Sequence, residues 1–71
     1  MTNQLEYVFE TEPDAYRFLN TVKHFDADKL VVKYGRSSFH VKVEYSYKSG
    51  EFDSTSSELD DLAASMSGQE V

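Results

Sequence analysis

The sequence predicts an α+β domain, a two-layer β-α-β-β-α sandwich with two helices on one face of a three-stranded sheet. Three segments alternate apolar and polar residues, as half-buried strands do, and two others repeat apolar residues at spacings of three and four, as amphipathic helices do. Each segment has one apolar side, so the helices and the sheet are expected to share a single core.

The first strand is expected at 4–10, where Leu5, Tyr7 and Phe9 fall on one side. A helix is expected to follow at 12–25. Thr11 suits its N-cap, and Pro13 suits its first turn because the missing N–H would have no intrahelical partner there. The apolar stripe of this helix consists of Ala15, Phe18, Leu19, Val22 and Phe25.

A polar loop at 26–28 leads into a second strand at 29–34, with Lys29, Val31 and Lys33 on its polar side. The turn "GRSS" at 35–38 closes a hairpin into the third strand at 38–47, the clearest alternation in the chain. A right-handed crossover through the first helix makes strands one and two parallel. The simplest arrangement then inserts strand three between them, in the order 1-3-2.

A second helix is expected at about 56–66, where Leu59, Leu62, Ala63 and Met66 form its stripe. Thr55 and Glu58 have the spacing of a capping box, and Gly68 suits the C-terminal end. Residues 1–71 form one domain whose last residues, 67–71, are expected to be flexible. This arrangement is like a ferredoxin-like fold that lacks its last strand.

The composition excludes several classes of function. The chain has 71 residues, a net charge of −6 and no cysteine, which removes disulfides and thiolate metal sites. A domain this small needs a supplement to its core, and a partner chain is the one left open. The opening residues lack the pattern of a signal peptide, so we expect a cytoplasmic protein.

The basic residues are concentrated in the middle of the chain. Residues 17–48 hold all seven of them against three acidic residues, a local charge of +4. This segment leaves weak nucleic-acid binding as an alternative function, although the aromatic rings of the third strand fall on the inward side, where they cannot stack on bases.

The uncovered side of the sheet is the expected functional surface. Three interpretations remain open for it: a merely solvated face, a nucleic-acid platform, or a contact for a second copy or another protein. We expect protein binding, with homodimer formation as its first form. The candidate partner-binding residues are Val31, Lys33, His40, Lys42 and Glu44.

No arrangement of residues indicates an enzyme, a metal site, a small-molecule substrate or a cofactor. His24 and His40 are the only groups suited to acid–base work near neutral pH, and neither has an evident nucleophile beside it. The stretch "HFDAD" at 24–28 lacks the glycine and further oxygens of a calcium loop. Asp60 and Asp61 are expected to be solvated, and Ser57 is either a capping-turn residue or an acidic-directed phosphorylation site.

Overall fold

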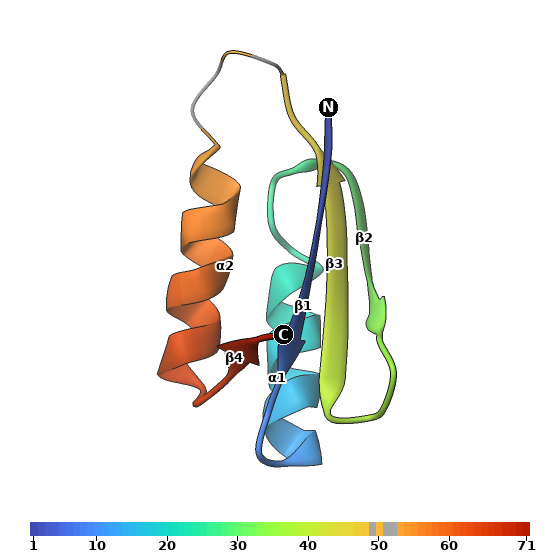
Figure 1. Ribbon diagram of the computed structural model, residues 1–71, viewed down its shortest axis with the longest axis vertical. Coiled ribbons are helices and arrows are strands. Elements are labelled where there is room, and N and C mark those ends of the chain that lie inside the picture. The colour runs from blue at the N-terminus through green and yellow to red at the C-terminus, as the bar shows by residue number, and fades with distance from the viewer. Residues whose placement is uncertain (49, 51–52) are drawn as a thin grey trace.

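The computed structural model describes residues 1–48, 50 and 53–71. The elements follow the order β1 (Thr2–Val8), α1 (Glu12–Val22), β2 (Asp28–Tyr34), β3 (His40–Ser46), α2 (Ser54–Ser65) and β4 (Gln69–Glu70) (Figure 1). The chain is therefore a small α+β domain with two helices and an antiparallel sheet. None of the helices in the described parts of the chain is both long and apolar enough to cross a membrane.

The sheet has four strands in the order β2-β3-β1-β4, and every neighbouring pair is antiparallel. The expectation of three strands is wrong. β4 was missed because its two residues, Gln69 and Glu70, carry no apolar alternation, and it pairs only with Tyr7 and Val8. β3 lies between β1 and β2, so β2 forms one edge of the sheet.

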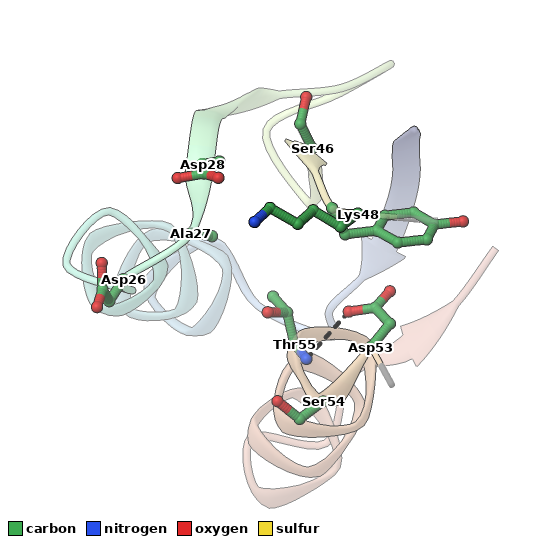
Figure 2. Close-up of a pocket in the computed structure, with 9 residues that line it drawn as sticks. Asp26, Ala27, Asp28, Ser46, Lys48, Asp53, Ser54 and Thr55 are labelled. Atoms are coloured by element: carbon green, nitrogen blue, oxygen red, sulfur yellow. Dashed lines mark hydrogen bonds between the residues drawn. The ribbon is translucent and has the colours of Figure 1, made fainter. Parts of the chain in front are cut away.

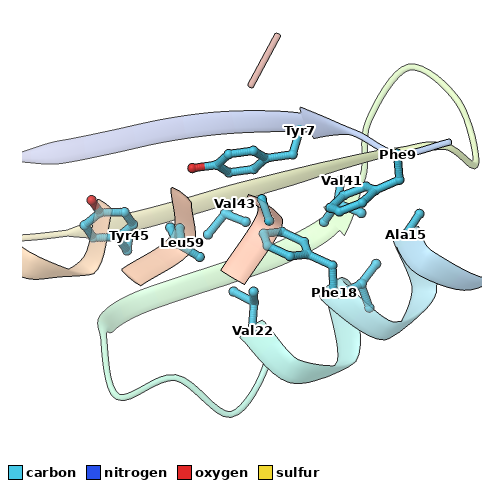
Figure 3. Packing of buried hydrophobic residues seen from close by; sticks show 11 residues of the cluster. Tyr7, Phe9, Ala15, Phe18, Val22, Val41, Val43, Tyr45 and Leu59 are labelled. Atoms are coloured by element: carbon cyan, nitrogen blue, oxygen red, sulfur yellow. The ribbon is translucent and has the colours of Figure 1, made fainter. Parts of the chain in front are cut away.

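The core fills the space between the sheet and α1 and α2. Figure 3 shows Phe18 and Val22 of α1 pointing toward the strands, where the side chains of Val41 and Val43 meet them. The predicted stripe of α1 is confirmed, since Ala15, Phe18, Leu19 and Val22 are all buried. The helix ends at Val22, earlier than expected, and Phe25 packs against the core from the following loop.

The start of α2 differs from the predicted capping box. Asp53 is the N-cap and accepts a hydrogen bond from the Thr55 N–H at 3.1 Å, so Thr55 belongs to the first turn of the helix. The second carboxylate oxygen of Asp53 accepts from the Tyr45 hydroxyl at 2.6 Å. One aspartate therefore caps the helix and also attaches it to β3.

Asp60 was expected to be only solvated, but it makes a contact with the sheet. Its carboxylate accepts a hydrogen bond from the hydroxyl of Tyr7, a buried side chain of β1. The neighbouring Asp61 is exposed, as expected. The two tyrosine–aspartate contacts thus add to the packing of Leu59 and Ala63, the buried residues of α2.

Candidate functional site

The five candidate residues come together on the two strands at the β2 edge of the sheet. Lys33 lies directly opposite Lys42, and Val31 lies directly opposite Glu44. His40 is two residues before Lys42 on β3, in the same side-chain phase. The buried side chains of β3 point to the opposite side of the sheet, where the helices pack. The five candidate residues therefore share the uncovered face.

The Lys33–Lys42 pair carries positive charge without a neutralising partner. Within the described residues, the ion pairs within 4.0 Å are Arg17–Asp14 and Arg36–Glu6, so neither lysine takes part in one. Like charges directly opposite one another destabilise a sheet. Glu6 pairs with Lys42 in the strand register, but its carboxylate is engaged elsewhere.

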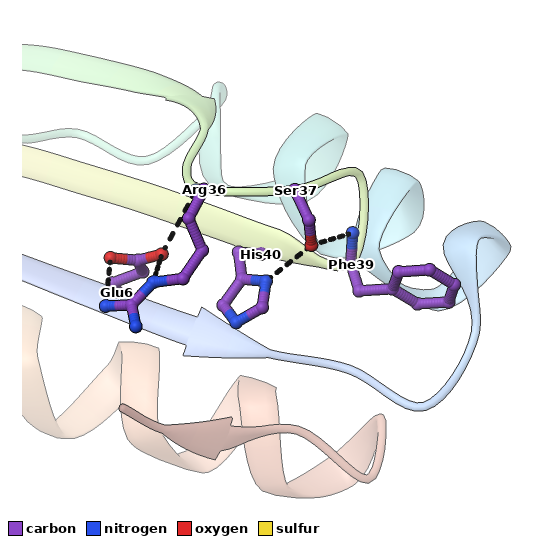
Figure 4. A network of polar contacts seen from close by, with 5 residues as sticks. All are labelled: Glu6, Arg36, Ser37, Phe39 and His40. Atoms are coloured by element: carbon purple, nitrogen blue, oxygen red, sulfur yellow. Dashed lines mark hydrogen bonds and ion pairs between the residues drawn. The ribbon is translucent and has the colours of Figure 1, made fainter.

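Glu6 bonds to Arg36 in the β2–β3 turn. Its two carboxylate oxygens accept from Nε and a terminal nitrogen of Arg36 at 3.2 and 3.3 Å (Figure 4). The hydrogen bond from Arg36 lowers the pKa of Glu6 below its ordinary value. A Cβ on Gly35 would lie within 3.0 Å of the Glu6 carboxylate, so the absence of a side chain at Gly35 lets Glu6 reach the turn.

His40 is held by the same turn. Its Nδ1 is hydrogen bonded to Ser37 Oγ at 2.6 Å, and Ser37 Oγ also accepts from the Phe39 N–H at 3.1 Å (Figure 4). The serine thus shapes the turn through a side-chain bond to the backbone two residues on. This contact brings a hydroxyl to an imidazole, and the turn sequence alone does not predict it.

A polar hollow of about 300 Å³ lies at the other end of the sheet. Its walls come from the loop before β2, the end of β3 and the first turn of α2; Figure 2 shows Lys48 reaching into it among Asp26, Asp28 and Asp53. Across the described ranges, no three histidine or acidic residues are placed to hold a metal ion.

The alternation that predicted Lys29 on the open face fails at one residue. A register shift lies between Asp28 and Val31, and Lys29 has a φ of 52°. This bulge places Asp28, rather than Lys29, in the row opposite Ser46. The contribution of β2 to the face therefore consists of Asp28, Val31 and Lys33.

Comparisons of the chain with protein-family models, with curated proteins and with solved structures found no match.

Sequence reasoning missed Glu6, Arg36 and Ser37 as neighbours of the candidate residues. Arg36 and Ser37 lie in a turn whose composition predicts a bend but no specific contact. Glu6 alternates with Leu5 and Tyr7 in the sequence, but its reach across β3 to Arg36 depends on the space above Gly35. The sequence did offer one signal for this ion pair. It has an arginine in the turn and a glutamate on the outward side of the first strand.

Proposed function

We propose that this domain is a small non-enzymatic protein–protein interaction module that forms a homodimer. It acts through the open sheet face or the adjoining edge strand, and the contact residues are Val31, Lys33, His40, Lys42 and Glu44. The order β-α-β-β-α-β, with β3 between β1 and β2, supports a ferredoxin-like arrangement for it.

The observation that carries this proposal is the Lys33–Lys42 pair. Two ammonium groups directly opposite each other repel, and the one carboxylate in their row is held by Arg36. A partner that brings carboxylates to this face relieves that repulsion. Beside the lysines, Val31 keeps 45% of its surface exposed and offers an apolar contact.

The mixed charge of the face supports a second copy as partner. Glu44 lies on β3 two residues from Lys42, so one side of the face is acidic and the other basic. A two-fold axis between them brings the lysines of each copy to Glu44 of the other. Surface buried between the two copies would add to the hydrophobic core, which is limited in a domain of this size.

Charge reversal at both lysines tests the face. We expect the natural chain to sediment as a dimer, and the variant Lys33→Glu/Lys42→Glu to dissociate at least about tenfold more readily, since several unfavourable charge contacts replace favourable ones. Sedimentation equilibrium at several concentrations measures this. Arg17→Glu/Lys23→Glu reverses two exposed charges on and next to α1, is matched in net charge, and should leave the dimer unchanged.

Circular dichroism separates a lost interface from a lost fold. A folded Lys33→Glu/Lys42→Glu variant that dimerises as the natural chain does would exclude the open face as the dimer contact. A natural chain that remains a monomer at the highest concentrations would show that self-association is wrong.

A further inference from the structure

The edge strand β2 has β3 on one side in the sheet order. Among the residues that the structure describes, no strand pairs with its outer side. The Gly35 N–H donates to the His40 carbonyl at 2.8 Å, so the N–H of Gly35 points toward β3. Because this direction alternates along a strand, the N–H and C=O groups of Val32 and Tyr34 point outward.

The side chains beside this edge differ between the two faces. On the helix side, Leu30 and Val32 are half-buried against the core, and Tyr34 keeps 45% of its surface exposed. On the open side are Val31 and Lys33, with Lys42 directly behind Lys33 on β3. The edge thus offers backbone hydrogen bonds flanked by an apolar strip below and a pair of lysines above.

We propose that β2 accepts an extended acidic segment of another protein as an added antiparallel strand. The inference rests on the proposed interaction function and names the partner's chemistry. The side chains along the edge determine which segment fits. It has an acidic residue opposite Lys33 and apolar residues opposite Val32 and Tyr34. Strand addition of this kind takes affinity from the backbone and specificity from alternate side chains.

The charges favour an acidic partner over a second copy of β2. A copy paired with β2 about a two-fold axis would bring its own Lys33 and Lys42 close to the first pair, giving four lysines on one face. The rest of the molecule repels an acidic segment, because the chain carries a net charge of −6. The lysine pair therefore directs such a segment to this edge. The bulge at Lys29 limits the pairing to about Leu30–Tyr34.

Two synthetic peptides of equal charge test the proposal. Both are capped and have the sequence Val-Glu-Val-Glu-Val-Glu-Val, but one is N-methylated at its three glutamates and the other at its second, third and fourth valines. In an antiparallel pair, the valines opposite Val32 and Tyr34 direct their N–H groups to β2. The glutamate-methylated peptide should therefore bind at least about tenfold more tightly, since the other loses backbone donors at the edge.

Nuclear magnetic resonance titration locates the binding. We expect the amides of Val32 and Tyr34 to exchange more slowly with solvent once the glutamate-methylated peptide is bound. Lys33→Glu should weaken this binding about tenfold, because one attraction becomes a repulsion. Lys23→Glu should not change it. A peptide of the same design with lysines in place of glutamates should not bind.

The outcomes separate this inference from the proposed function. Equal binding of the two methylated peptides would overturn strand addition and indicate a charge contact on the open face alone. No binding by either peptide would overturn the inference, whereas the dimer measurement decides the proposed function independently. Self-association of Lys33→Glu through β2 would show instead that the lysine protects the edge from pairing.

Discussion

Two buried tyrosines connect neighbouring strands to the same helix. Tyr7 of β1 donates to Asp60, and Tyr45 of β3 donates to Asp53, so each hydroxyl removed from water finds a carboxylate of α2. Asn3 adds a donor to the Tyr45 oxygen at 2.9 Å. A buried hydroxyl is costly without such a partner, and hydrogen bonds to charged groups are among the stronger ones.

Tyr7→Phe should lower the free energy of unfolding by about 1.5–3 kcal/mol, the usual contribution of a hydrogen bond to a charged group. Urea unfolding measures the change. Tyr16→Phe removes a hydroxyl from an exposed tyrosine and should stay within about 0.5 kcal/mol of the natural chain. Equal stability of the two variants would mean that the Asp60 contact contributes nothing.

The buried Tyr7 hydroxyl should also make the free energy of unfolding depend on pH. Burial, together with the nearby Asp60, raises the pKa of Tyr7 well above its ordinary value. Tyrosine in the unfolded chain ionises near pH 10, so the stability that Tyr7 contributes is present below about pH 10 and is lost as the pH rises above it. Tyr7→Phe should therefore lose less stability than the natural chain between about pH 9 and 11.

At the scale of the element, the end of α2 depends on two adjacent residues with different requirements. Ser67 has a φ of 60°, the left-handed region that favours glycine, and the Gly68 N–H donates to the Ala63 carbonyl at 2.7 Å. Gly68 is needed for space, because a Cβ there would lie within 3.0 Å of the Phe9 ring.

Single substitutions at these two residues should change the free energy of unfolding in opposite directions. Ser67→Gly should raise the free energy of unfolding by about 0.5–1 kcal/mol by relieving the backbone. Gly68→Ala should lower it by about 1–3 kcal/mol, since Phe9 is buried and has little room to move. Thermal unfolding of both variants checks the pair, and a neutral Gly68→Ala would mean that the ring has space to shift.

Elements with strong periodicity were predictable, and contacts between distant residues were not. The alternation in 38–47 and the stripe in 12–25 located β3 and α1 because each pattern repeats over several residues. The Asp53 cap was hidden because Thr55 and Glu58 offered a competing box. The Tyr7–Asp60 contact joins residues 53 apart in the chain, and no local pattern encodes it.

At the scale of the whole molecule, charge and size set how two copies approach. Each copy carries −6, and the domain measures 36 × 21 × 19 Å. At about 10 mM salt the screening length is roughly 30 Å, so the net charges of two copies repel over a distance as large as one domain; at about 150 mM it is roughly 8 Å.

The proposed dimer should therefore form more readily at the higher salt concentration. Binding of the acidic peptide should weaken over the same range, because salt screens its attraction to Lys33 and Lys42. Sedimentation and peptide titration at the two salt concentrations check the opposite trends. A dimer weakened by salt would indicate that local ion pairs, rather than net repulsion, dominate its formation.

The central position of β3 also determines the order in which the sheet assembles. β2 is its neighbour along the chain and can pair within about 1–10 μs, as hairpins do. β1 must instead close a loop that includes α1 and β2, so its pairing bears a larger entropic cost and follows later. Until β1 arrives, the edge of β3 that pairs with β1 in the finished sheet has no partner strand. A foreign strand can therefore reach this edge of β3 only while the chain is folding.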